Sequence, residues 1–357
     1  MNFKSTLLAK IICLSILIVS PVLMFAVSEA AVIFLLIEPG SRPGGMGQAY
    51  VAQVEDGLSG YWNPGAMAFN RETQISFMHS NWLGDVDGID DMYIEYLGAN
   101  HYFEEYSGNL GFHAMYLTYG KQERTSENND QLGTFTSYEL ALALTYAYQY
   151  SEDLGLGINF KFILSDLADE GTGQTESGVK GRGISYAFDL GLKKKNILIN
   201  KLDFGLNLQN IGPNITFINE DQSDPLPMNF RMGLSYRLLE SEFSTFTINT
   251  DMNKLLANDD FVLKRLFTAW YDDGGLFSSE EIESTIFNVG AEYTYYNLLS
   301  LRGGYIYDKA GSITGPSFGA GILFDLTTTT KLSIDFAMQQ GGELVDYNKT
   351  FSVGLEF

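Results

Sequence analysis

For most of its length the chain alternates apolar and polar positions. In residues 136–150, Tyr and Leu occupy every second position, with Glu, Ala, Thr and Gln between them. Residues 154–165 repeat the pattern, with Leu, Ile and Phe alternating with Gly, Asn and Lys. Successive side chains of a β-strand point to opposite faces. The pattern therefore predicts strands with one apolar face.

Fourteen segments of this kind follow one another. A strand that crosses a membrane needs about 9–11 residues, and bacterial outer-membrane barrels have an even number of strands. The sequence therefore predicts an all-β fold, a 14-stranded antiparallel outer-membrane barrel. The predicted strands are 73–80, 90–99, 108–119, 136–150, 154–165, 183–193, 201–210, 228–239, 243–253, 285–296, 299–308, 315–326, 330–338 and 348–357.

The connections between these segments alternate between long and short. Outer-membrane barrels have short turns on the periplasmic side and longer loops outside the cell. We therefore expect the long connections outside and both termini in the periplasm of a bacterium with two membranes. The long connections include 120–135, 166–182, 211–227, 254–284 and 339–347, and the short ones include 151–153, 196–200, 297–298 and 327–329.

The first 30 residues differ from the strands. Lys4 and Lys10 form a basic region ahead of a largely apolar run, Ile11–Phe25, and the small residues Ser28 and Ala30 follow it. This is the pattern of a signal peptide, here with cleavage after Ala30. The only cysteine of the chain, Cys13, lies within it, so the mature protein is expected to have no disulfide.

Residues 31–72 also lack the alternating pattern. Ser41–Phe69 is rich in glycine and contains the turn Asn63-Pro64-Gly65. A barrel of fourteen strands is wide enough to need a plug or to hold a channel. We therefore interpret residues 31–72 as a hatch inside the lumen, and residues 73–357 as the wall around it.

Composition agrees with a membrane barrel and excludes one class of partner. Only 18% of the residues are charged, against about 25% in typical soluble domains. The formal charge of −22 argues against nucleic-acid binding, which needs basic surface.

No motif for catalysis or for a cofactor stands out. The three histidines, His79, His101 and His113, lack the spacing of metal ligands. The acidic run 85–91 resembles a calcium loop, but Tyr96 stands where the loop needs its last glutamate, so a solvated loop is the better interpretation. Known nucleotide, protease and hydrolase fingerprints are missing. We predict a non-enzyme without cofactor or metal; an enzyme with loop-borne catalytic residues ranks last.

The long connection 254–284 is of another kind. It mixes apolar and charged residues at loosely helical spacing. Exposed apolar surface of this sort indicates a partner or a cap over the barrel mouth; a loop folded onto its own barrel fits equally well. The candidate partner-binding residues are Leu263, Phe267, Trp270 and Phe277.

Several motifs resemble known outer-membrane families. Gly44-Gly45-Met46-Gly47, then Asp56, then Trp62-Asn63-Pro64, resembles the N-terminal signature of the PorV/PorQ proteins. The wider pattern is shared with the FadL-type fatty-acid channels, which have fourteen strands and an N-terminal hatch. Those families commonly have Asn-Pro-Ala, whereas this chain has Asn-Pro-Gly. Three later stretches resemble PorV in particular: 210–216, 226–233 and 251–256.

The resemblance implies a component of the type IX secretion system. Such a protein would bind the C-terminal signal domain of exported cargo at a large translocon barrel and carry it to the surface attachment complex. Its partners would be that barrel, the cargo and membrane lipid. The alternative is a FadL-like channel for uptake of hydrophobic molecules. A sealed lumen favours the first hypothesis, and a continuous apolar tunnel favours the second.

Overall fold

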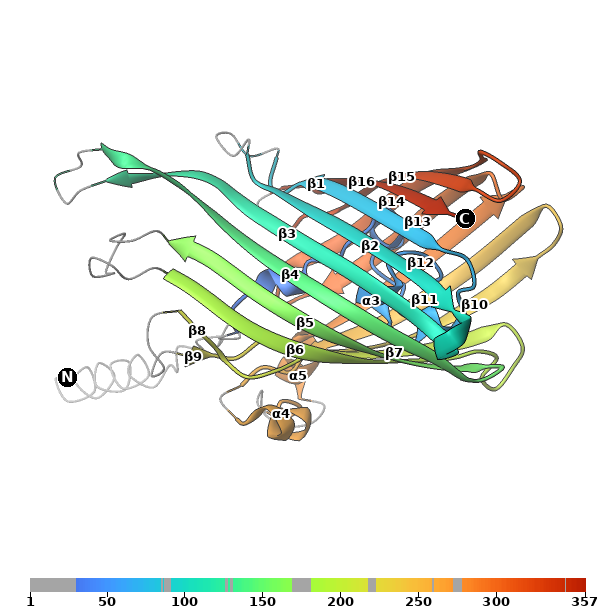
Figure 1. The fold of residues 1–357 in the computed structure, drawn as a ribbon, viewed down its shortest axis with the longest axis horizontal. Helices are drawn as coiled ribbons and strands as arrows, with labels where there is room; N and C mark the ends of the chain where they lie inside the picture. Colours follow the sequence, from blue (N-terminus) through green and yellow to red (C-terminus); the bar gives the residue numbers. More distant parts are fainter. Residues whose placement is uncertain are drawn as a thin grey trace, which may run out of the picture.

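Fourteen antiparallel strands form a closed barrel in the computed structural model (Figure 1), which confirms the predicted fold class and strand number. The structure describes residues 30–84, 86, 91–125, 128, 131–168, 181–217, 223–258, 260–271, 278–343 and 345–357. The barrel strands are β1 Gln74–Asn81, β2 Tyr93–Phe103, β3 Gly108–Thr125, β4 Gln131–Ser151, β5 Leu154–Ala168, β6 Gly181–Lys194, β7 Leu202–Ile211, β10 Asn229–Glu240, β11 Ser244–Leu255, β12 Thr285–Tyr295, β13 Leu299–Asp308, β14 Ile313–Asp325, β15 Lys331–Gln340 and β16 Tyr347–Glu356.

The strands β3 and β4 are longer than the sequence predicted. Most of the expected loop 120–135 continues the hairpin, which projects beyond its neighbours (Figure 1). The added part of β3, residues 121–125, contains only polar residues. A strand with water on both sides needs no apolar face, so the alternating pattern that revealed the other strands is absent there.

The connections divide the barrel into two ends, which we call the long-connection end and the short-turn end. The alternation fails once, because the connection 309–312 at the long-connection end is shorter than the turn 326–330. Three other connections hold further elements. These are η3 Glu104–Tyr106, the small sheet of β8 Ile215–Thr216 and β9 Ser223–Asp224, and the helices α4 Val262–Thr268 and α5 Ser279–Glu283. Among the described residues, no helix has the length and apolar composition to cross a membrane.

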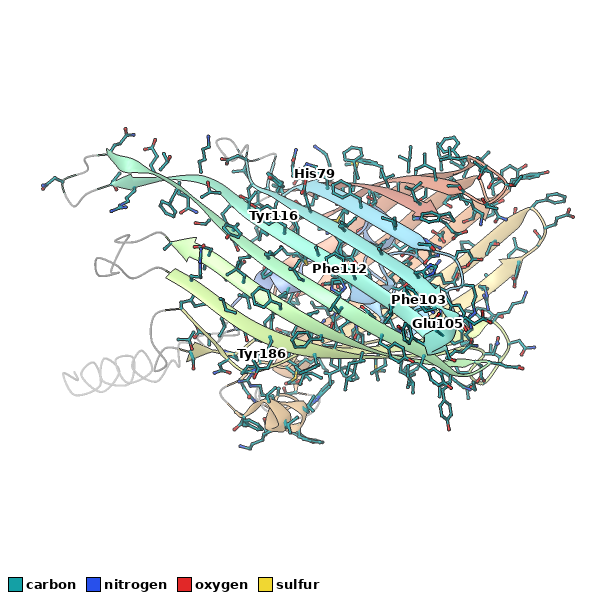
Figure 2. All side chains as sticks on the ribbon, in the orientation of Figure 1. His79, Phe103, Glu105, Phe112, Tyr116 and Tyr186 are labelled. Atoms are coloured by element: carbon teal, nitrogen blue, oxygen red, sulfur yellow. The ribbon has the colours of Figure 1, made fainter. Side chains whose placement is uncertain are left out.

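The apolar face of the strands points outward. On β6 the side chains of Ile184, Tyr186, Phe188 and Leu190 are 41–58% exposed, and the residues between them are buried. Figure 2 shows side chains of this kind over the outer surface, with Tyr116 and Tyr186 toward the long-connection end and Phe103 toward the other. Such a surface suits lipid, with tyrosines at the two membrane interfaces.

The N-terminal residues lie inside the barrel (Figure 1). They form four short helical turns, η1 Ile33–Leu36, α2 Ser41–Gly45, α3 Ser59–Trp62 and η2 Ala66–Phe69. We keep the name hatch for residues 31–72.

The hatch runs along the lumen from one side to the other. Ala31 donates to the carbonyl of Pro225, in the connection 212–228 at the long-connection end, at 3.0 Å. Thr73 exchanges two backbone hydrogen bonds with Phe357, of 2.8 and 3.0 Å, at the short-turn end. The sequence led us to expect both termini at the same end of the barrel, and the described chain does not have them there. The hatch runs along the lumen, so Ala31 and Phe357 lie toward different ends. The signal-peptide prediction concerns residues 1–30, all but the last of which lie outside the described residues.

Candidate functional site

The hatch touches the wall through glycines on both sides of the contact. A Cβ atom added to Gly65 would lie 2.7 Å from backbone atoms of Gly191 on β6. One added to Gly45 would lie 2.8 Å from the Cα atom of Gly319 on β14. No side chain fits at such distances, so glycine is needed for the close approach of the two backbones.

The Gly-Gly-Met-Gly motif packs on the opposite side of the lumen from the Asn-Pro turn. Gly44 faces Ala337 of β15, and Met46 is fully buried against Gly304 of β13. Gly47 adopts a φ of +60°, which disfavours a side chain, with its Cα against the backbone of Tyr305. The motif therefore serves to seat the hatch against β13–β15.

Trp62 is the largest fully buried side chain. Its Nε1 donates to the carbonyl of Pro39 at 2.9 Å, and the guanidinium of Arg231 lies 4.4 Å from its ring. Arg231, on β10, also pairs with Glu38 of the hatch. Burial raises the pKa of Glu38 to about 7, although Arg231 acts in the opposite direction.

Asn63 and Pro64 shape the turn that meets β5 and β6. The Nδ2 of Asn63 donates to Val51 within the hatch at 2.9 Å and to Leu192 on β6 at 3.0 Å. Its Oδ1 accepts from the amide of Gly65 at 3.0 Å, which forms an Asx turn. Pro64 packs against the backbone of β5 and β6.

A carboxylate of the wall holds the hatch by its backbone. Asp251 on β11 accepts hydrogen bonds from the amides of Tyr50 and Val51, at 2.7 and 2.8 Å. Arg231 and Asp251 come from the stretches that resemble PorV. Those motifs, distant in the sequence, therefore meet around the hatch.

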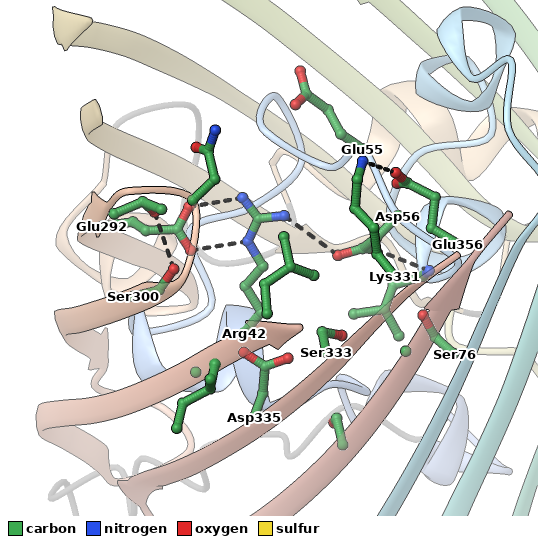
Figure 3. A pocket seen from close by; sticks show the side chains of 18 of the residues that line it. Arg42, Glu55, Asp56, Ser76, Glu292, Ser300, Lys331, Ser333, Asp335 and Glu356 are labelled. Carbon is green, nitrogen blue, oxygen red and sulfur yellow. Dashed lines mark hydrogen bonds and ion pairs between the residues drawn. The ribbon is translucent and has the colours of Figure 1, made fainter. Parts of the chain in front are cut away.

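An ionic network, which we call the clamp, joins α2 to strands β12, β13 and β15 on the side of the wall against which α2 packs (Figure 3). Arg42 donates from Nε and Nη2 to the two oxygens of Glu292, at 2.9 and 2.7 Å. Arg302 donates to Glu292 at 2.7 Å and to Asp335 at 2.6 Å. Asp56 lies 3.6 Å from Nη1 of Arg42, and its pKa is raised by burial, with Arg42 acting in the opposite direction. Paired and hydrogen-bonded in this way, the buried charges are compensated.

Below the clamp, at the short-turn end, lies a cavity of about 820 Å³. Figure 3 shows Ser76, Ser333, Lys331 and Glu356 around it. Ligand pockets for apolar molecules are mainly lined by apolar and aromatic side chains. More than half of the residues that line this cavity are charged or carry a hydroxyl, and the rest include several aliphatic residues, so the lining is mixed and not mainly apolar.

On the long-connection side of the hatch the lumen is apolar and filled. Phe34 and Leu35 of η1 form one cluster with inward-facing Met115 and Ile163, and with Ile215 from the connection 212–228. Every buried member of this cluster is at most 6% exposed. Among the described residues, the apolar side chains therefore pack on one another rather than line a tunnel.

The connection 256–284, which we call the insert, lies on the outside of the barrel (Figure 1). The ring of Trp270 meets that of Phe230, an outward residue of β10, with centroids 5.4 Å apart. Lys254 is buried beneath the insert, 2.8 Å from Glu281 and 2.6 Å from the hydroxyl of Ser284. The insert is thus folded onto the wall and does not cap the barrel mouth.

The insert nevertheless leaves an apolar face exposed, which we call the outer face. Leu263 and Phe267, one helical turn apart on α4, are 58 and 73% exposed, and Phe261 and Tyr271, which flank the helix, are 71 and 57% exposed. Of the predicted partner-binding residues, the structure brings Leu263 and Phe267 together on this face. Trp270 belongs to the side that contacts the barrel, and Phe277 lies outside the described residues.

The clamp and the role of Asp251 were not predicted from the sequence. A signal was present, because Glu292, Arg302 and Asp335 are charged residues within membrane-spanning strands. Such residues almost always face the interior and find partners there. Among the described residues, no group of three or more His, Cys, Asp or Glu side chains is placed to hold a metal ion.

Comparison with known proteins found a matching family for this chain. The family model described as "Type IX secretion system protein PorV" matches residues 25–260. No curated protein matches the sequence.

Several solved structures share the fold. The Pseudomonas putida toluene transporter TodX has 12% identity and a TM-score of 0.54, over 89% of this chain and 97% of that one. The CymD monoaromatic hydrocarbon channel has 13% identity and a TM-score of 0.52, over 90% and 97%. The Ralstonia pickettii toluene transporter TbuX has 11% identity and a TM-score of 0.51, over 90% and 98%. At these identities the likeness shows that the chain shares the fold of these barrels, and no more.

Proposed function

This chain belongs to the family of the type IX secretion system protein PorV, and on that premise we propose that it is a non-catalytic carrier of exported proteins in the outer membrane. It binds the C-terminal signal domains of its cargo and passes them from the translocon to the surface attachment complex. The observation that carries the proposal is the contrast between a lumen filled by the hatch and an apolar face left exposed on the outside.

The proposed orientation places the long connections outside the cell. The outer face of the insert then lies at the cell surface, beside the barrel wall, where another barrel in the membrane can reach it. Leu263 and Phe267 are the described residues that we propose for contact with a partner, and Phe277 remains a candidate outside the described residues. Exposed apolar patches often mark interaction sites.

Purification of the full-length protein from cells that run type IX secretion tests the proposal. A mild detergent extract should contain a large barrel and exported proteins with the signal domain, and Leu263→Ser with Phe267→Ser should reduce both. Leu198→Ser is the matched control, because Leu198 is 95% exposed but lies in the turn between β6 and β7, at the short-turn end. Recovery of this protein without the large barrel and without exported proteins would contradict the proposal.

The second candidate is a channel for hydrophobic molecules. It is favoured by the fold that the chain shares with proteins titled as toluene transporters. The cavity, whose lining is not mainly apolar, and the packed apolar cluster count against it. Uptake of a monoaromatic hydrocarbon by cells, measured with and without this protein, separates the two: a loss of uptake on deletion would favour the channel, and an unchanged rate favours the carrier.

A further inference from the structure

The insert rests on the end of the lipid-facing band. Its barrel-facing side covers Leu208, Ile211 and Phe230. Leu208 and Ile211 are on β7 and Phe230 is on β10. The next outward residues of β10 are Met232 and Leu234, which are 37% and 39% exposed and face the membrane. The helix α4 is therefore a lateral extension of the apolar band and not an element above it.

The strand register links the wall under α4 to a tyrosine on β13, while the position of α4 along the barrel is seen in Figure 2, because strands tilted by about 35–45° put paired residues at different heights. Met232 pairs with Met252, Met252 with Phe287, and Phe287 with Tyr307. Tyr307 is 42% exposed and is one of the tyrosines near the long-connection end. Phe230, under the insert, is one outward position further toward that end. In Figure 2 the helix likewise projects at about the same position along the barrel as Tyr186 and Tyr116.

The outer face has the composition of an interfacial helix. Phe261, Leu263, Phe267 and Tyr271 supply the apolar surface, and the side chain of Lys264, 62% exposed, supplies a cation beside it. Segments with such a face lie in the membrane surface, with their apolar side about 5–10 Å into the boundary between headgroups and acyl chains. Tyrosine and lysine at that boundary keep their polar ends in water.

We propose that the outer face is a lipid-binding surface, inserted into the outer leaflet beside the barrel when no protein partner covers it. The occupant is the boundary between headgroups and acyl chains, because the face continues the established lipid-facing band at the level of the tyrosines. A protein partner must then displace lipid from it. The inference requires only a barrel in the outer membrane and does not depend on the proposed role in secretion.

Spin labels test this directly. Since the predicted mature chain has no cysteine, a single cysteine can be placed at Phe267 or at Leu263 and labelled with a nitroxide. Two control labels set the scale, one at lipid-facing Phe160 and one at exposed Glu123 in the hairpin that projects from the barrel. The purified mature protein is placed in bilayers of phosphatidylethanolamine and phosphatidylglycerol, and heat-modifiable gel mobility shows that each variant is folded.

The measured quantity is the ratio of collision rates with oxygen, which concentrates in lipid, and with a water-soluble nickel chelate. We expect the ratio at positions 267 and 263 to exceed that at position 123 several-fold and to approach that at position 160. A ratio equal to that at position 123 would show that the face is in water and would overturn the inference. Protection from both reagents would show that a second copy of the chain covers the face, and would overturn it too. Neither result would change the outcome expected in the purification experiment, so the lipid-binding proposal can fail while the proposed role in secretion stands.

Discussion

The hatch and the insert use similar residues for opposite purposes. In the hatch, Trp62 is fully buried, its Nε1 is hydrogen-bonded and its ring carries a cation. In the insert, Phe267 is 73% exposed. The hatch precedes the regular series of strands, and the insert interrupts it between β11 and β12. One is enclosed by the wall at all points, whereas the other touches it along one side only.

The difference shows where the protein can interact. Buried ion pairs and glycine contacts hold the hatch at several heights of the lumen, so a ligand that passes through must break many of them at once. The outer face can be occupied without breaking any contact of the barrel. Four variants, the last of them a double substitution, test this contrast, and the most damaging is described first.

Glu292→Gln should cause the largest loss. It removes the shared partner of part-buried Arg42 and buried Arg302 and leaves each with one carboxylate; breaking a buried pair typically costs about 3–5 kcal/mol. The free energy of unfolding in urea, measured in detergent, gives the effect. Lys331→Gln is the control, because its pair with Glu356 is partly exposed and contributes about 0–1 kcal/mol. Equal effects for the two variants would mean that the clamp does not hold the hatch.

Gly191→Val should rank next. Its Cβ would lie 2.6 Å from the amide nitrogen of Gly65, so either the hatch or β6 must shift, at a cost of about 1–3 kcal/mol. At Gly303 nothing lies within 4 Å of an added Cβ, so Gly303→Ala is the matched control and should leave unfolding unchanged. If Gly191→Val is as stable as the control, the close contact of hatch and wall is absent in solution.

Trp270→Ala should loosen the insert and spare the barrel. The contact with Phe230 is lost, and a paired aromatic is worth about 0.5–1.5 kcal/mol beyond its buried area. We expect protease to cut the insert several-fold faster, with the urea midpoint of the barrel little changed. Phe267→Ala, on the outer face, should not change the rate of cleavage. Equal rates in the two variants would show that Trp270 does not anchor the insert.

Leu263→Ser with Phe267→Ser should have the smallest effect on stability. Substitutions at exposed sites usually change the free energy of unfolding by less than about 0.5 kcal/mol, and both side chains are more than half exposed. A loss above about 1 kcal/mol, measured in the same urea titration, would show that the outer face is part of the barrel's own packing.

The sequence was enough to predict the wall. Lipid outside and hatch inside impose a period of two on each strand, and that period is visible in single residues such as those of β6. The hatch was predicted from two features of residues 31–72: the alternating pattern is absent there, and glycines are frequent. The all-polar end of β3 was missed because water on both sides imposes no period.

The ion pairs between the hatch and the wall could not be predicted from the sequence. Arg42 and Glu292 are 250 positions apart, and many inward carboxylates were possible partners for the arginine. In the insert, loosely helical spacing did not tell which apolar side chains face the wall, so Trp270 and Phe267 were grouped together. The structure separates them because only Trp270 lies against Phe230.

If the hatch fills the lumen, this barrel can act only through its outside. Electrical conductance of the purified mature protein in a planar lipid bilayer tests this most directly. A lumen closed by the hatch predicts a bilayer that stays at its baseline conductance after insertion, with insertion verified by recovering the folded barrel from the membrane. A steady stepwise conductance from the unmodified protein would show that the lumen is open, and would contradict the account.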